Sequence, residues 1–267
     1  MENQPILFAF LLTLFAGLST GIGGLIALLA RKTNTTFLSF SLGLSAGVMI
    51  YVSFMEMLPA SLESLALVFD EKTGMLYMIL SFFGGIALIA LIDFLVPESS
   101  NPHEMHGVED MGNRRRNRGL KQTGMVTAIT IAIHNFPEGI ATFMSALTSL
   151  EVAIPITAAI AIHNIPEGIA VAVPIYHATG SRKKAFWLSL ASGLAEPLGA
   201  LIAYLFLMPF WSPSLNAIVL SAVAGVMVFI SLDELLPSAE KYGKHHHAII
   251  GMVVGMAVMA LSLYLFL

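Results

Sequence analysis

The sequence predicts an all-α, polytopic membrane protein with eight transmembrane helices. Of its 267 residues, 57% are hydrophobic and only 11% are charged, and the mean hydropathy is +0.82. A soluble domain carries about 25% charged residues, so this composition excludes an ordinary globular protein. Long apolar runs alternate with mostly short links, and the Lys and Arg residues gather in the links. This distribution is typical of a chain whose helices cross a bilayer repeatedly.

Eight stretches are long enough to span, since a spanning helix needs about 20 apolar residues. They lie at approximately 6–29, 36–58, 75–96, 123–147, 152–176, 185–208, 214–236 and 248–267, within one transmembrane domain, 1–267. The first run lacks a basic leader and is predicted to stay as a span rather than to be cleaved. The one long link, 97–122, is polar, contains His103 and His106, and predicts a loop.

The basic residues predict the orientation. An even number of spans puts both termini on one side, and the links on that side hold only Lys72 of the 13 Lys and Arg residues. Because cytoplasmic links carry the excess of Lys and Arg, both termini are predicted to lie outside the cytoplasm. The links on the cytoplasmic side hold Arg31, Lys32, Arg114, Arg115, Arg116, Arg118, Lys121, Arg182, Lys183, Lys184, Lys241 and Lys244.

Internal repeats relate the two halves of the chain. One eight-residue motif occurs twice, as His134–Ala141 in the fourth span and His163–Ala170 in the fifth, and Ala46–Met49 in the second span matches Ala224–Met227 in the seventh. The first span resembles the sixth, whereas no clear match relates the third to the eighth. Paired spans are an odd number apart and cross in opposite directions. This predicts an inverted repeat of three spans, a central pair and three spans, which is typical of alternating-access transporters.

The repeated motif places polar groups at one depth. The histidine, asparagine and glutamate of each copy share a helix face, because residues three or four apart lie on the same side. Counting from the span ends at about 1.5 Å per residue places both faces, and Glu196 of the sixth span, near mid-bilayer. The candidate metal ligands at this depth are His134, Asn135, Glu138, His163, Asn164, Glu167 and Glu196.

A buried cluster of carboxylates and imidazoles is expected to bind a cation. Ionisable groups are costly in the bilayer, and several adjacent carboxylates must be protonated or neutralised. Imidazole nitrogens and carboxylate oxygens are good ligands for Zn²⁺, Fe²⁺, Mn²⁺ and Co²⁺. Pro137, Pro166 and Pro197 leave helix carbonyls without their usual donors, and so predict kinks beside the ligands. The sequence contains no cysteine, which excludes thiolate sites and disulfides.

Other functions explain the repeated motif less well than metal transport does. An interhelical hydrogen bond is the simplest explanation for a single intramembrane histidine, but it does not explain two copies of the whole motif. A membrane-embedded metalloenzyme, either a di-metal oxidase or a hydrolase, is the alternative. The sequence contains neither the His-Glu-x-x-His pattern expected of a zinc hydrolase nor the Glu-x-x-His pattern expected of a di-metal oxidase. A carrier of organic solutes would be expected to have a basic residue near the site, and this sequence has none there. An ATP-driven pump would need a phosphate-binding loop, which the sequence also lacks.

The two motifs resemble those of the fourth and fifth helices of the ZIP (Zrt/Irt-like) metal transporters, and the resemblance covers all eight spans. It implies a secondary transporter, not an enzyme, which moves Zn²⁺, and also Fe²⁺, Mn²⁺, Co²⁺ and Cd²⁺, across the cell (inner or plasma) membrane into the cytoplasm by an elevator-like motion. The metal is substrate and no cofactor is implied. The implied site is binuclear. Its first position is formed by His134, Glu138, His163 and Glu167, and its second by Asn135, Asn164 and Glu196 with both motif glutamates bridging.

Further polar residues each allow two interpretations. Glu56 and Glu234 occupy matching places in the second and seventh spans and either mark the mouths of the pathway or are ordinary acids near helix ends. The histidines of the 97–122 loop and of His245–His247 either receive released metal or belong to solvated links. The expected partners are metal ions and lipid, with no nucleic acid, and a homodimer is left open.

Overall fold

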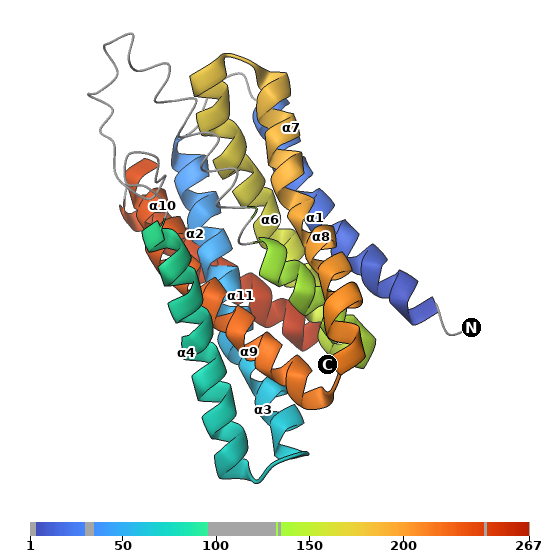
Figure 1. The fold of residues 1–267 in the computed structure, drawn as a ribbon. Helices are drawn as coiled ribbons and strands as arrows, with labels where there is room; N and C mark the ends of the chain where they lie inside the picture. The colour runs from blue at the N-terminus through green and yellow to red at the C-terminus, as the bar shows by residue number, and fades with distance from the viewer. Residues whose placement is uncertain (1–3, 30–34, 96–131, 133–134, 243–244, 267) are drawn as a thin grey trace.

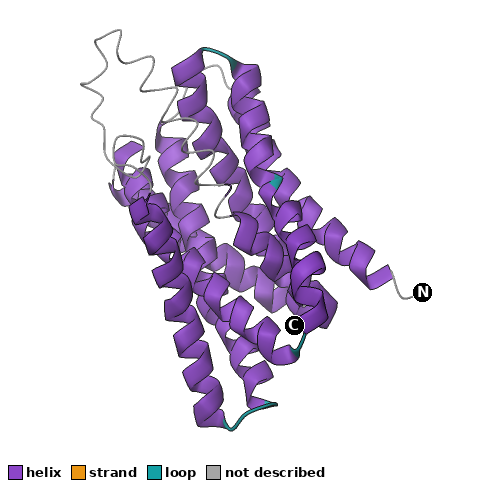
Figure 2. Cartoon of the chain, viewed as in Figure 1, coloured by secondary structure: helices purple, strands orange, loops and turns teal. Residues whose placement is uncertain are grey.

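Helices account for all the regular structure in the part of the chain that the computed structural model describes, residues 4–29, 35–95, 132, 135–242 and 245–266 (Figures 1 and 2). This confirms the predicted all-α class. Residues 135–148 form a helix between α4 and α6. The other α-helices are α1 (Gln4–Leu29), α2 (Thr35–Val52), α3 (Leu58–Ala66), α4 (Glu71–Leu95), α6 (Leu150–Thr179), α7 (Arg182–Gly193), α8 (Ala195–Ile202), α9 (Pro213–Ile230), α10 (Leu236–Tyr242) and α11 (His245–Phe266).

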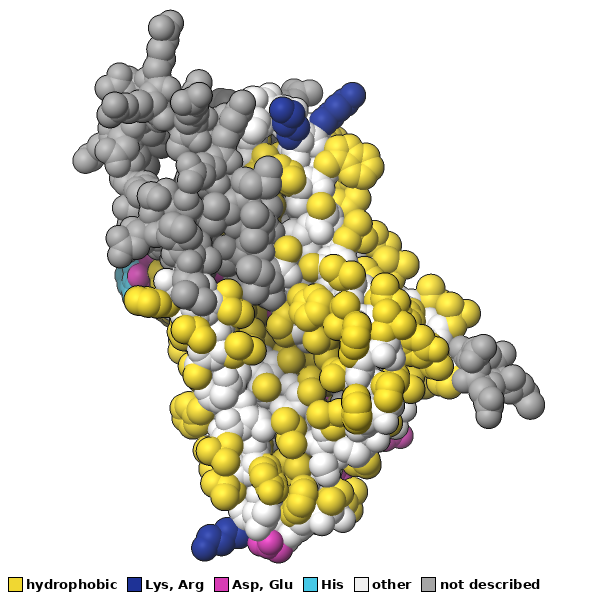
Figure 3. Space-filling view, viewed as in Figure 1, with side chains coloured by type: hydrophobic (Ala, Val, Ile, Leu, Met, Phe, Trp, Pro, Cys, Tyr) yellow, Lys and Arg dark blue, Asp and Glu magenta, His cyan; other side chains and the backbone are white. Residues whose placement is uncertain are grey.

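Seven helical runs among the described residues are long and apolar enough to cross a membrane. They match seven of the predicted spans, whereas much of the predicted fourth span, 123–147, lies outside the described residues. The second run extends to Ala66, well past its predicted end. Over the face drawn in Figure 3, apolar side chains form a broad band, and Lys and Arg appear only at its two opposite ends. Such a surface suits lipid around the middle and water at the ends.

Local sequence signals fix the ends of several helices. The side chain of Ser181 accepts a hydrogen bond from the backbone N–H of Lys184 at the start of α7, and Ser212 does the same for Leu215 at the start of α9. These serines satisfy N–H groups that have no partner inside the helix. Gly180 ends α6 with a φ of 64°, in the left-handed region that glycine adopts readily.

Two π-helical segments interrupt matching places in the second and seventh spans. Ser53–Met57 joins α2 to α3, and Ser231–Leu235 joins α9 to α10. The hydroxyl of Ser53 donates to the carbonyl of Met49, and Ser231 donates to Met227, both at 2.7 Å. Each segment is followed by proline in the next helix, which cannot supply the usual backbone donor. These local π turns let the spans continue through the interruption.

The helices pack as two groups that meet at α2 and α6. In the first group, α1 packs along α6, α7 and α8; in the second, α2 packs along α11, and α4 along α9 (Figure 1). The α2–α6 contact joins the groups, and the core around it includes Met49, Ile160 and Met227, all buried. The middle of α6 therefore lies inside the molecule, where only paired polar groups are tolerated.

Glycine brings helix backbones together within each group. A Cβ at these positions would clash with a backbone carbonyl of the facing helix. In the first group the approaches are Gly17 with Gly193, Gly23 with Ile165, Gly168 with Thr20, Gly139 with Glu196 and Gly199 with Phe136. In the second group they are Gly43 with Ala248, Gly47 with Met252, Gly251 with Phe40, Gly255 with Leu44, Gly85 with Ala222 and Gly225 with Phe82. Among the described glycines, none packs this closely on the opposite group.

Candidate metal site

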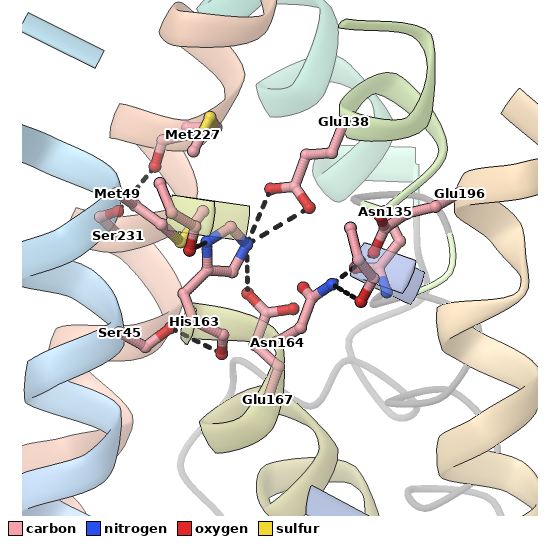
Figure 4. A network of polar contacts seen from close by, with 12 residues as sticks. Ser45, Met49, Asn135, Glu138, His163, Asn164, Glu167, Glu196, Met227 and Ser231 are labelled. Carbon is pink, nitrogen blue, oxygen red and sulfur yellow. Dashed lines mark hydrogen bonds and ion pairs between the residues drawn. The ribbon is translucent and has the colours of Figure 1, made fainter. Parts of the chain in front are cut away.

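The structure brings together six of the seven predicted ligands. Helix 135–148 supplies two, the middle of the 30-residue α6 supplies three, and the first turn of α8 supplies one (Figure 4). All six side chains are buried. They are Asn135, Glu138, His163, Asn164, Glu167 and Glu196. The seventh predicted ligand, His134, lies outside the described residues.

Glycine explains how these helices come close enough to share a site. In each motif the glutamate is followed directly by glycine. A side chain at Gly139 would clash with the backbone of Glu196, and one at Gly168 would clash with Thr20 of α1. The motif therefore supplies a carboxylate and, in the next position, the space that lets a neighbouring helix backbone approach it.

The imidazole of His163 is surrounded by carboxylates. Its Nε2 atom lies 3.3 Å from Oε1 of Glu138 and 3.8 Å from Oε1 of Glu167 (Figure 4). Its Nδ1 atom lies 3.1 Å from the carbonyl oxygen of Ala159, and because a carbonyl only accepts, Nδ1–H donates the hydrogen bond. A neutral ring then presents the Nε2 lone pair to the acids, an arrangement that a metal ion or a second proton makes favourable.

The two asparagines place amide oxygens at the site. Asn164 donates through Nδ2 to the carbonyl of Ala16 at 2.8 Å and to Oε1 of Glu196. Asn135 donates through Nδ2 to the carbonyl of Ser192 at 3.3 Å. These contacts fix the amide orientation, because in each case only the nitrogen can donate. Both amide oxygens remain as acceptors.

Unsatisfied acceptors gather in this region. Oδ1 of Asn135, Oδ1 of Asn164 and Oε2 of Glu196 are buried and accept no hydrogen bond. Buried polar atoms normally have partners, so oxygens of this kind are suited to bind a cation or to accept protons. Among the described residues, no three His, Asp or Glu side chains already surround a metal position as they stand. The imidazole and the carboxylates instead contact one another.

One proline has the predicted effect on its helix. The sixth span breaks between α7 and α8 at Leu194, three residues before Pro197. This break brings Glu196 into the first turn of α8, beside Asn164. Pro166, by contrast, lies within the uninterrupted α6.

Sequence reasoning missed Ser45, which the structure places beside the site. Its hydroxyl donates to the carbonyl oxygen of His163 at 3.3 Å and so connects α2 to α6 (Figure 4). A serine in an apolar helix next to the repeated Ala-Gly-Val-Met segment was the available signal. Glu56 and Glu234 occur in the matching π-helical segments, with Glu56 half-buried and Glu234 buried. His103 and His106 lie outside the described residues.

Comparisons with known proteins show which family the chain belongs to. Residues 95–263 match the family model described as ZIP Zinc transporter. The chain is 58% identical to the zinc transporter ZupT of Streptococcus mutans over 99% of this chain and 100% of that protein. It is 61% identical to ZupT of Corynebacterium glutamicum over 98% of this chain and 100% of that protein, and 57% identical to ZupT of Clostridium perfringens over 98% and 97%.

Proposed function

Because the chain belongs to the ZIP family of zinc transporters, we propose that the divalent metal ions it carries pass through a binuclear site between helix 135–148, α6 and α8. The chain is a membrane transporter and not an enzyme, so the metalloenzyme alternative is set aside. The first metal position takes His134, Glu138, His163 and Glu167. The second takes Asn135, Asn164 and Glu196, with Glu138 and Glu167 bridging. Zn²⁺ is the principal substrate, and Fe²⁺, Mn²⁺, Co²⁺ and Cd²⁺ are further substrates of the same site.

The observation that carries this proposal is the excess of buried acceptors. The amide oxygens of both asparagines and one oxygen of Glu196 lack donors, and the Nε2 atom of His163 faces two carboxylates. A divalent cation would satisfy these groups together. The ligands are nitrogen and oxygen with no sulfur, a mixture that Zn²⁺ accepts and that several other first-row ions share.

We also propose eight spans related by inverted repeats in the order three, two, three. The glycine approaches support this order because most of them have a counterpart at the positions that the inverted repeat relates. The pairs are Gly23–Ile165 with Gly199–Phe136, Gly168–Thr20 with Gly139–Glu196, Gly47–Met252 with Gly225–Phe82, and Gly255–Leu44 with Gly85–Ala222. The last two pairs relate the third span to the eighth, for which the sequence alone offered no match. The π-helical segments at Ser53–Met57 and Ser231–Leu235 form a further pair.

The two groups of helices suggest how the ion moves. Tight glycine approaches occur within each group, whereas the contact of α2 with α6 relies on larger side chains such as Met49 and Ile160. An elevator-like displacement of the group that contains α6 would preserve the glycine contacts and carry the ligands with it. Helix pairs that slide past one another as units are a common route for such changes.

Transport is proposed to run into the cytoplasm across the cell (inner or plasma) membrane, with both termini outside. The excess of Lys and Arg in the links after the odd-numbered spans supports this orientation. The start of α1 and the end of α11 lie toward the same half of the molecule, and the α6–α7 link, which directly precedes Arg182, lies at the opposite end (Figure 1).

The test is zinc entry into proteoliposomes that contain a zinc-sensitive dye. The wild type is compared with Glu167→Ala and with Glu151→Ala, a matched control at the exposed start of the same helix. We expect entry in the wild type and the control and none with Glu167→Ala. Equal entry in all three would refute the role of the central site. No entry in any, with zinc still bound to the purified wild type, would refute transport.

A further inference from the structure

A histidine at the start of α11 and a glutamate in α10 interact on the surface of the protein. The Nδ1 atom of His245 lies 2.6 Å from Oε1 of Glu240, and both side chains are exposed, at 65% and 42%. An exposed pair of this kind adds little to stability. These residues do not belong to the central site, and the transport mechanism proposed above does not use them.

The contact determines which ring nitrogen can bind a ligand. Because a carboxylate only accepts, the Nδ1–H of His245 donates to Glu240, and the Nε2 atom of the neutral ring keeps its lone pair. Histidines that bind metals almost always donate their other N–H to a carboxylate or a carbonyl, which fixes the ring and makes it more basic. The pair therefore already has the arrangement of a metal-binding histidine with its supporting acid.

A second imidazole lies at a suitable distance. The ring centroids of His245 and His246 are 5.7 Å apart. With Zn–N distances of about 2.0–2.1 Å, each ring centroid lies about 3.2 Å from the metal, and a tetrahedral angle separates the two centroids by about 5.2 Å. The observed spacing is close to this value, so the two rings are near enough to share one ion. His247 is left out, because two residues further along a helix it points about 200° away from His245.

We propose that Glu240, His245 and His246 form a second metal-binding site, on the surface, in which both imidazoles bind a divalent transition-metal ion and Glu240 orients His245. Water completes the coordination. Imidazole ligands favour Zn²⁺, Cu²⁺ and Ni²⁺ over Mg²⁺ and Ca²⁺. The site is separate from the helices that carry the central ligands.

The position of the site gives it a role that rests on the transport function proposed above. α10 directly follows the π-helical segment that contains Glu234, and Glu240 lies six residues on, about 9 Å further along the helix. An ion that passes Glu234 toward this end of the molecule would therefore meet the imidazoles next. The surface site would hold that ion briefly at this end.

The test measures metal bound to the purified full-length chain without an affinity tag. In a Glu138→Ala/Glu167→Ala background, which removes the central carboxylates, we expect one Zn²⁺ or Co²⁺ to remain per chain. The bound Co²⁺ should show the visible absorption of imidazole coordination. Adding His245→Ala/His246→Ala should abolish that binding, and adding Glu240→Gln should weaken it about 10- to 100-fold. Glu71→Gln, at an exposed acid at the start of α4, is the control.

Retention of the residual metal after both histidines are replaced would overturn the proposal, and so would an unchanged affinity after Glu240→Gln. If the background variant does not fold, the same comparison in the wild-type chain should show one metal fewer after the histidine replacements, and no difference would overturn the site. Zinc entry into proteoliposomes tests the transport function separately. A chain that keeps its surface metal but admits no zinc would refute transport and leave this site standing.

Discussion

Replacing Gly168 by alanine tests whether the α1–α6 approach builds the metal site. A Cβ at this position would clash with the carbonyl oxygen of Thr20, which is backbone and cannot rotate away. Overpacking of this kind costs about 1–3 kcal/mol, and the better helix propensity of alanine offsets about 0.5–1 kcal/mol. The net loss, up to about 2.5 kcal/mol, lowers the melting temperature by up to about 10 °C for a chain of this size.

The matched control is Gly84→Ala in α4, where an added Cβ would meet no atom within 4 Å. Only the propensity gain applies there, so thermal unfolding of the purified protein should shift upward by about 1–4 °C. Gly168→Ala should also reduce zinc entry into proteoliposomes, because separating α6 from α1 breaks the hydrogen bond from Asn164 to Ala16. Equal upward shifts for both variants, with full zinc entry, would refute the reasoning.

Three further changes probe the site and its surroundings. Asn164→Ala removes two donated hydrogen bonds, one of them to Glu196, and should lower the melting temperature while reducing zinc entry less than Glu167→Ala does; complete loss of entry would mean that the second metal position is indispensable. Ser45→Ala removes the hydrogen bond to the carbonyl of His163, worth about 0.5–1.5 kcal/mol, and should change the maximal rate of entry with little change in apparent zinc affinity, since no ligand atom is lost; an unchanged rate would show that this contact does not restrain α6. Deleting residues 101–118 should leave metal binding at the central site intact, as measured by equilibrium dialysis, and loss of that metal would show that the site is misplaced.

The helical class and the ligand cluster followed from the sequence because both depend on residue type. Apolar runs of sufficient length predicted eight spans, and seven of them match helices among the described residues that are long and apolar enough to cross a membrane. Pro197 predicted a kink, and the helix breaks three residues before it. The repeated motif predicted that its polar residues converge, and the structure brings His163 within 3.3 Å of Glu138. In each case the structural feature depends on the chemical type of a specific side chain, which the sequence states directly.

Other features escaped prediction because backbone atoms carry them. The third and eighth spans share only the placement of glycines such as Gly85 and Gly255, whose partners are carbonyl groups that any residue provides. No side-chain identity needs to match in such a contact. The second span was predicted to end near residue 58, whereas a π-helical segment lets it continue through Pro59 to Ala66. The local change of helix type accommodates this proline inside the span.

A transporter must release the ion that it binds, and the contacts within the site bear on that requirement. Asn164 donates to Glu196, and the Nε2 atom of His163 lies 3.3 Å from Oε1 of Glu138. These contacts give the buried carboxylates partners, so losing an ion from the proposed site would cost less than it would for isolated buried carboxylates. The same contacts would compete with an ion and lower its affinity, which favours release. An aspartate at position 164 would add a negative charge and remove a donor, which would favour binding over release. The amide at this position therefore suits turnover better than tight retention of the ion.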